Sequence, residues 1–321
     1  MGTSMRTTRL ARTAQTAGSG TGLGQRRAGL TVGTIGWMAA MLAFVISIVT
    51  AFAVGSATKS QVAALEVLSF GIAIAALGTG KTGIVLVLRG ILRRIGLRID
   101  AIKEALPQLV PTQTPAADLP LSAGIVKTPY GRVRVTPQRP EPLFVHSMAR
   151  LLWAPMLLMG LMALYGGLLI ALIAAGATDP ASARSLKAWV QGTQFLGEGF
   201  LLSAISFALG TILAAIRTGG GEVQESLKAP VRTLLMPATG KIFLGLMMLG
   251  LMVEIVQFVL YGYVASLHDD ATITVYSTWL GPFREFGLGV LLSGVVLALA
   301  TIARAFDFQS SRVRELITTG R

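Results

Sequence analysis

Long apolar stretches separated by short polar segments dominate this chain. Each stretch runs for about 20 residues, which is enough for an α-helix to cross the roughly 30 Å apolar layer of a bilayer. No stretch alternates apolar and polar residues with the period of two that barrel strands show, so the pattern indicates helices. Six spans are predicted, at residues 33–54, 64–88, 151–175, 195–216, 242–264 and 286–303.

Composition agrees with this pattern. The chain has 321 residues, of which 53% are hydrophobic and 13% are charged, whereas soluble domains carry roughly 25% charged residues. The sequence therefore predicts an all-α integral membrane protein that crosses the cell (inner) membrane several times. The basic, acid-free first 30 residues resemble an organelle transit peptide in composition. An organelle inner membrane is thus the alternative, although orientation of the first span also requires basic residues there.

The distribution of positive charge predicts the orientation of the spans. Of the 28 Lys and Arg residues, 23 lie in the two terminal segments or in the loops predicted on the same side of the membrane, and four lie in loops on the other side. Because cytoplasmic loops are enriched in Lys and Arg, both termini are predicted to be cytoplasmic (N-in/C-in). The net charge of +13 is then explained by basic loops facing an anionic leaflet, so no nucleic-acid partner is expected.

Two of the predicted spans resemble each other and indicate an internal repeat. Residues 195–217 align without gaps to residues 282–304, and residues 157–162 resemble residues 247–252. We therefore predict three helical hairpins in the same orientation, with span 2 joining the series loosely. The alignment pairs Glu198 with Glu285, Ser206 with Ser293 and Arg217 with Arg304, and Glu66 and Arg89 hold the corresponding positions around span 2. Short Glu-bearing segments follow the even spans, at residues 102–106, 223–227 and 313–316.

The chain divides into five predicted segments. Eight prolines between residues 107 and 142 favour an extended linker, in which residues 124–136 could close a β-hairpin. Residues 91–106 have Ile and Leu at helical spacing opposite Arg, which suits a helix on the inner membrane surface or against a partner. The segments are a disordered basic cytoplasmic tail (1–31), hairpin 1 with its amphipathic inner helix (32–106), a Pro-rich cytoplasmic linker (107–142), hairpin 2 (143–228), and hairpin 3 with a C-terminal amphipathic segment (229–321).

Residues 75–82, AALGTGKT, resemble a phosphate-binding loop. The first position is Ala75 instead of Gly, and the motif lies inside an apolar stretch with no strand before it. Its N–H groups are therefore expected to belong to the second span, and no nucleotide is expected to bind. Lys81 lies eight residues before Arg89, about 12 Å from the inner end of the span, where a long side chain can reach water. The motif's glycines (Gly78, Gly80, Gly83) are expected to permit close helix packing or a local break.

Glu254 lies near the centre of the fifth predicted span, and Gln257 shares its helix face. A central charge costs about 2.5–3.5 kcal/mol on insertion scales. Neutralising a carboxyl at pH 7 costs about 3.7 kcal/mol, from 1.36 kcal/mol per pH unit. The two costs are similar, so both protonation states stay open. Glu254 either belongs to a proton or cation pathway or makes a hydrogen bond to a neighbouring helix or subunit.

The other candidate groups are acids and histidines near the span ends. Glu66, Glu198 and Glu285 are interpreted as helix-start acids favoured by the helix dipole, or as carboxylates that converge on one axis. His146 and His268 are predicted on opposite sides of the membrane, which excludes haem ligation by both. His268 precedes two aspartates, but consecutive residues rarely converge on a metal, and a solvated loop is favoured.

No catalytic, cofactor-binding or metal-binding residues are predicted. The chain has no Cys, which excludes thiolate chemistry, and no hydrolase or zinc-protease motif occurs. The leading hypothesis is a non-enzymatic scaffold or accessory subunit of a membrane complex. Its expected partners are the lipid bilayer and a protein or second copy within the membrane. The alternative is a small transporter or ion channel that uses Glu254, and a membrane enzyme is the third possibility.

Overall fold

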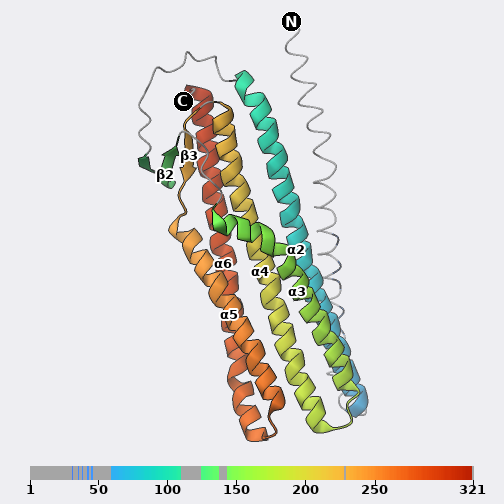
Figure 1. The fold of residues 1–321 in the computed structure, drawn as a ribbon. Coiled ribbons are helices and arrows are strands. Elements are labelled where there is room, and N and C mark those ends of the chain that lie inside the picture. The colour runs from blue at the N-terminus through green and yellow to red at the C-terminus, as the bar shows by residue number, and fades with distance from the viewer. Residues whose placement is uncertain are drawn as a thin grey trace.

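The computed structural model describes residues 59–109, 124–136, 143–227 and 229–319, together with the single positions 31, 35, 38, 42 and 45. The described part is mainly helical, and its long helices lie side by side in one elongated bundle (Figure 1). Its helices are α2 (Lys59–Leu109), α3 (Phe144–Ala175), α4 (Pro180–Ser226), α5 (Ala238–Ser266) and α6 (Asp270–Thr319). Its strands are β1 (Gly124–Thr128), β2 (Gly131–Thr136) and β3 (Val231–Leu234).

Four of the described helices, α3 to α6, are long and apolar enough to cross a membrane. This confirms the predicted class of a helical membrane protein. The second predicted span, residues 64–88, lies inside α2. The first, residues 33–54, lies almost entirely outside the described residues.

Three helices are much longer than the spans predicted within them. Helices α2, α4 and α6 contain 51, 47 and 50 residues, which corresponds to about 70–77 Å at 1.5 Å per residue. The Glu-bearing segments at 102–106, 223–227 and 313–316 are therefore the last turns of these helices and not separate elements. Even the run Gly219–Gly221 is helical, because Ile99 of α2 and Gln309 of α6 pack directly against it.

Helix α4 is the central element of the bundle and contacts α2, α3, α5 and α6. Its small residues permit the close approach of its neighbours, as is common where membrane helices pack. A Cβ added at Gly197 would lie 3.0 Å from the carbonyl oxygen of Gly160 in α3. A Cβ added at Gly192 would lie 2.9 Å from Cβ of Tyr261 in α5. The main apolar core, which includes Leu202, surrounds this helix.

Helix α3 is bent near its N-terminus. Its first turns run across the bundle before the helix turns to lie along α4 (Figure 1), and Pro155 lies inside it. Proline removes one helical hydrogen bond and clashes with the preceding turn, which accounts for the bend. Beside the bend, the guanidinium of Arg89 in α2 lies 5.0 Å from the ring centre of Trp153.

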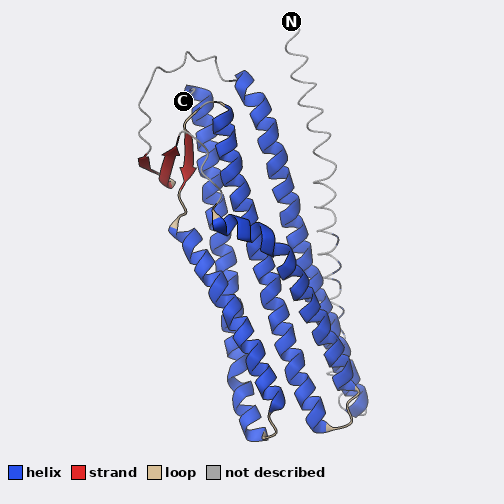
Figure 2. Ribbon diagram, viewed as in Figure 1, coloured by secondary structure: helices blue, strands red, loops and turns tan. Residues whose placement is uncertain are grey.

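A three-stranded antiparallel sheet in the order β1-β2-β3 lies beside the C-terminal ends of α4 and α6 (Figure 2). The predicted hairpin over residues 124–136 is confirmed, and its turn includes Gly131 with φ of 131°. Strand β3 was not predicted. Gln224 of α4 fixes it, because its side chain pairs with both the N–H and the C=O of Arg232. Arg312 of α6 donates to the same Gln224 oxygen at 3.2 Å.

The α3–α4 and α5–α6 connections lie at the opposite end of the bundle (Figure 1). The carboxylate of Asp179 accepts a hydrogen bond from the N–H of Ser182 at the start of α4. Asp269 accepts in the same way from Thr272 at the start of α6. The hydroxyl groups of Ser182 and Thr272 also donate to these carboxylates. Their hydrogen bonds are the main reason that the pKa of both exposed carboxyls is lowered, and the backbone hydrogen bonds lower it further. Arg184 pairs with Asp270 and joins the two helix starts.

Candidate functional site

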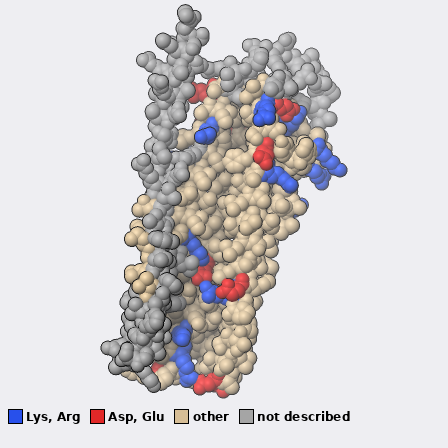
Figure 3. All heavy atoms as spheres, turned by 180° about the vertical axis from the view of Figure 1, so that it is seen from behind, with Lys and Arg blue, Asp and Glu red and all other residues tan. Residues whose placement is uncertain are grey.

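Four ionisable side chains from four helices meet inside the bundle, and we name them the charge cluster. They are Lys81 of α2, Glu198 of α4, Glu254 of α5 and Arg284 of α6. Figure 3 shows charged side chains on one face at both ends of the molecule and in a smaller group between them, within a broad uncharged surface. A charged side chain inside a helical bundle that spans a bilayer is costly, so such side chains usually have ion-pair partners or a function.

Glu198 and Arg284 form the ion pair of the charge cluster. Nη2 of Arg284 lies 3.2 Å from Oε2 of Glu198, and the Glu198 side chain is only 5% exposed. The guanidinium also stacks over the ring of Phe195, 4.1 Å from its centre. Gln194 donates to Oε1 of Glu198 at 3.4 Å. These contacts anchor the carboxylate, because a delocalised guanidinium can pair and stack at the same time.

Glu254 lies beside this pair and is completely buried. Neither of its carboxyl oxygens has a hydrogen-bond partner among the described residues. Two glycines leave room for its side chain: a Cβ at Gly199 of α4 would lie 2.5 Å from its Cγ, and a Cβ at Gly287 of α6 would lie 2.8 Å from its Oε1. Glu254 therefore sits between α4 and α6 with its polar atoms unsatisfied, which is the costliest arrangement for a buried carboxyl.

Two other polar side chains, Gln257 of α5 and Lys81 of α2, lie near Glu254. Gln257 is completely buried and donates to the carbonyl oxygen of Leu280 at 3.0 Å. Lys81 interacts electrostatically with Glu198 and Glu254. The helix around it is continuous: residues 75–82 lie inside α2, as predicted, and the Thr82 hydroxyl donates to the carbonyl of Gly78 at 2.8 Å. Of the two alternatives for the glycines of this motif, the local break is wrong, because α2 is continuous there. Close packing is confirmed at Gly78, where an added Cβ would lie 3.2 Å from Leu164 of α3.

The interpretation of the repeat-related acids as helix-start residues is wrong for Glu198 and Glu285. Helix α4 begins at Pro180 and α6 at Asp270, so both acids lie several turns inside their helices. Glu198 is buried and the Glu285 side chain is 72% exposed, yet both carboxylates pair with Arg284, at 3.2 and 3.8 Å from its Nη atoms. Glu66 lies in α2, and its side chain is outside the described part of the structure.

Arg284 is the member of the charge cluster that sequence reasoning missed. It was counted only among the few basic residues of the outer side. A usable signal was present, because Arg284 follows Pro282 and precedes an apolar stretch. An arginine at the start of an apolar helical stretch needs a buried counter-ion. Its partner lies 86 residues away in the chain, so no local pattern could identify Glu198 as that counter-ion.

The charge balance of the cluster indicates what it can do chemically. With all four groups ionised, two positive charges balance two negative ones, and the exposed Glu285 carboxylate, 3.8 Å from Arg284, adds a further negative charge at the edge of the cluster. Uptake of a proton by Glu254 makes the cluster positive by one unit, and its release restores neutrality. Because Glu254 has no competing hydrogen bond among the described residues, neither form is fixed by a partner. The arrangement is therefore suited to reversible binding of a proton or a small cation.

The structure brings no further metal or histidine chemistry to this site. Within the described residues, no three His, Cys, Asp or Glu side chains are grouped as metal ligands would be. His146 is buried at the start of α3, and His268 is exposed in the α5–α6 connection at one end of the bundle, so the two histidines lie apart (Figure 1). No protein-family model, no curated protein and no solved structure matches the chain, so the function has to be inferred from the site itself.

Proposed function

We propose that the chain is a membrane transporter whose charge cluster binds and releases a proton, with Glu254 as the titrating group. The observation that carries this proposal is the completely buried Glu254 carboxyl, whose oxygens lack a partner among the described residues. A lone carboxyl would be a poor relay. The neighbouring Glu198, Arg284 and Lys81 supply a second acid and two cations within electrostatic range.

The predicted orientation supports the proposal. In the proposed arrangement of six spans with both termini cytoplasmic, the inner surface of the bilayer would lie at the level of the Arg89–Trp153 pair and the bend of α3. Trp and Arg favour this interface. Lys81 then lies eight residues, or about 12 Å, deeper in the membrane. The charge cluster is thus placed where a proton has to pass through protein and not through water.

The orientation has its own test. An impermeant reagent should label a cysteine introduced at Ser182, near the α3–α4 connection, from outside intact cells. Cysteines introduced at Ser310 or within the N-terminal tail should be protected until the membrane is opened. Labelling of both ends from outside would contradict the predicted orientation.

Proton flux into vesicles tests the function. Purified protein is reconstituted into liposomes that contain a pH-sensitive dye, and a potassium gradient with valinomycin imposes a membrane potential. The wild type should acidify or alkalinise the lumen faster than protein-free vesicles do. Glu254→Gln preserves volume and hydrogen-bonding capacity but cannot titrate, so it should abolish the flux. Glu285→Gln, which removes an exposed carboxyl from α6, should retain it.

Thermal unfolding of the same variants separates loss of function from loss of fold. Glu254→Gln should unfold at or above the wild-type temperature, because a neutral amide replaces an unsatisfied carboxyl. Glu254→Leu should lose flux as well. No flux in the wild type, with the imposed potential verified, would contradict the transport proposal.

A second candidate function is a scaffold or accessory subunit, and one observation favours it. Helices α2, α4 and α6 extend well past the bend of α3, and the three-stranded sheet lies beside the ends of α4 and α6. The ion pairs Arg232–Glu315 and Lys103–Glu222 hold this extension together. A stable extension of this kind could bind another protein. Copurification of a stoichiometric partner from native membranes, lost on removal of the sheet, would favour this function.

A further inference from the structure

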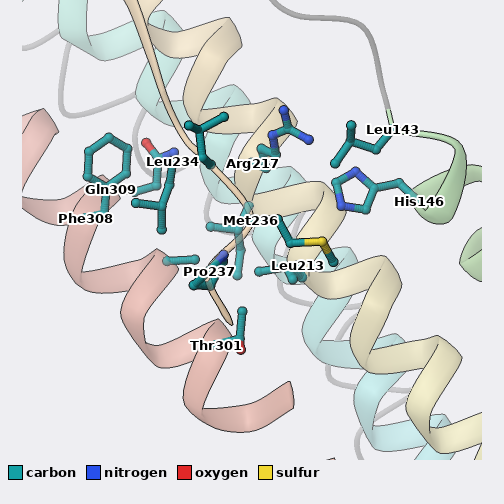
Figure 4. Close-up of a pocket in the computed structure, with 13 residues that line it drawn as sticks. Leu143, His146, Leu213, Arg217, Leu234, Met236, Pro237, Thr301, Phe308 and Gln309 are labelled. Carbon is teal, nitrogen blue, oxygen red and sulfur yellow. The ribbon is translucent and has the colours of Figure 1, made fainter. Parts of the chain in front are cut away.

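A small pocket lies beside the start of α3, apart from the charge cluster. It is formed by the first turn of α3, the C-terminal half of α4, the β3–α5 connection and α6 (Figure 4). Its volume is about 40 Å³, roughly three times the minimum that holds one water molecule. The pocket therefore has room for a compact group of several atoms. Most of its lining is apolar, including Leu213, Met236 and Phe308.

Two basic side chains of this pocket carry unsatisfied nitrogen atoms. Nδ1 of His146 and Nε of Arg217 are buried and have no hydrogen-bond partner among the described residues. His146 is 6% exposed, and its ring points into the space between Arg217 and Met236 (Figure 4). Nε–H of Arg217 is an unpaired buried donor, and Nδ1 of a neutral imidazole donates in one of its two tautomers. An acceptor in the pocket would remove the free-energy cost of leaving these groups unpaired.

The positive charge at this pocket comes from three arginines. Arg150 and Arg217 both act electrostatically on His146, and Arg134 of β2 acts on Arg217. In the described part of the chain, none of these three arginines forms an ion pair with a carboxylate. The pocket is thus a concentration of uncompensated positive charge, and an anion would neutralise it.

The position of the pocket identifies the kind of anion. The first turns of α3, which carry His146 and Arg150, run across the bundle at the level proposed for the inner membrane surface (Figure 1). Phe144 and Leu151 of the same segment are strongly exposed, as expected for residues that contact lipid. Basic pockets between helices at this surface bind the head groups of anionic lipids.

We propose that this pocket binds the phosphate group of an anionic phospholipid of the inner leaflet, with Arg217 and His146 as its ligands. The phosphate occupies the pocket, and the acyl chains remain outside in the bilayer, beside the exposed apolar residues of α3. Arg134 and Arg150 contribute longer-range attraction. The proposal is independent of Glu254 and of proton transport.

Native mass spectrometry of the full-length protein in a neutral detergent tests this site. Phosphatidylglycerol and phosphatidylcholine with identical acyl chains are added separately, and the bound fraction is measured as lipid concentration rises. The wild type should bind at least one phosphatidylglycerol about tenfold more tightly than phosphatidylcholine, because the zwitterion cannot neutralise the pocket. Arg217→Gln should remove about tenfold of the phosphatidylglycerol affinity and leave phosphatidylcholine binding unchanged. Arg217→Lys should restore most of it.

Arg304→Gln is the matched control. Arg304 aligns with Arg217 in the sequence, but its side chain is exposed on α6, so its removal should change the affinity less than twofold. Equal losses in Arg217→Gln and Arg304→Gln would overturn the proposal, since they would indicate unspecific attraction. If Arg217→Gln fails to fold, Arg134→Gln in the sheet should still weaken phosphatidylglycerol binding several-fold, and an unchanged affinity would overturn the proposal.

Inorganic phosphate distinguishes a lipid from a free anion. Phosphate added in excess to protein in neutral-detergent micelles that contain phosphatidylcholine should give little thermal stabilisation, whereas phosphatidylglycerol should raise the unfolding temperature by several degrees. Stabilisation by inorganic phosphate that equals that of the lipid, and that is lost in Arg217→Gln, would assign the pocket to a soluble phosphate and overturn the lipid proposal.

Discussion

Helices α4 and α6 share a sequence pattern, yet only α4 is surrounded by other helices. In their most apolar stretches, 78% of the α4 residues are buried and 28% of the α6 residues are. Ser206 is buried whereas its counterpart Ser293 is exposed, and Glu198 is buried whereas Glu285 is exposed. Similar sequences therefore have different roles here, because α4 is packed against α2, α3, α5 and α6. The repeat in the sequence does not imply a repeat in function.

The largest expected difference in stability between variants of α4 and α6 concerns the two acids Glu198 and Glu285. Glu198→Ala removes the buried counter-ion of the half-buried Arg284 and leaves it only the exposed Glu285, and breaking a buried pair by removing one partner costs about 3–5 kcal/mol. Because the Arg284 side chain is 28% exposed, we expect the lower end of this range. Glu285→Ala removes an exposed group and should change stability by less than about 0.5 kcal/mol. Unfolding in mixed detergent measures both, and equal effects would contradict the assigned burial.

A smaller difference is expected for two glycines. A Cβ at Gly197 of α4 would lie 2.8 Å from Leu164 Cγ and 3.0 Å from a backbone oxygen of α3, which cannot easily move. Gly197→Ala should therefore destabilise the protein by about 1–3 kcal/mol. At Gly289 of α6, no atom lies within 4 Å of an added Cβ, so Gly289→Ala should be neutral or stabilise the helix by up to about 1 kcal/mol. A neutral Gly197→Ala would show that the α3–α4 contact is loose.

The smallest effect is expected where the two helices are alike. Asp179 and Asp269 cap α4 and α6 through the same hydrogen bonds, which lower the pKa of both carboxyls. A carboxyl with a lowered pKa stabilises the fold above its ordinary pKa, and this contribution is lost as pH falls through the folded-state value. Asp179→Asn and Asp269→Asn should each flatten the acid limb of stability against pH slightly and equally. A clearly larger effect of either variant would show that the two caps are not equivalent.

Local features of the fold were predictable from the sequence. The apolar stretches predicted the class of the protein, and the turn around Gly131 predicted the β1–β2 hairpin, because each depends only on neighbouring residues. Strand β3 was not predictable in this way. Its four residues are held by Gln224 and by β2, and neither partner adjoins it in sequence. The lengths of α4 and α6 were underestimated, since the bilayer limits only the apolar part of a helix.

The candidate site also combines features that depend on neighbouring residues with features that depend on distant ones. Glu254 was identifiable because an acid within an apolar helix is conspicuous, Gln257 because it shares the helix face of Glu254, and Lys81 because it belongs to the motif at residues 75–82. The pairing of Glu198 with Arg284, and the pocket between His146 and Arg217, were not identifiable. Both depend on which helix faces lie together in the bundle.

The sequence by itself determined that this chain is a helical membrane protein with a polar residue at the middle of its fifth predicted span. Hydrophobic length and charge distribution are properties of short segments, and the bilayer acts on each segment directly. Only the tertiary structure decided that α4 is central, that Glu198 is buried while Glu285 is exposed, and that four charges share one site. Burial and ion pairing depend on residues brought together from distant parts of the chain, and similar local sequences can therefore meet different neighbours.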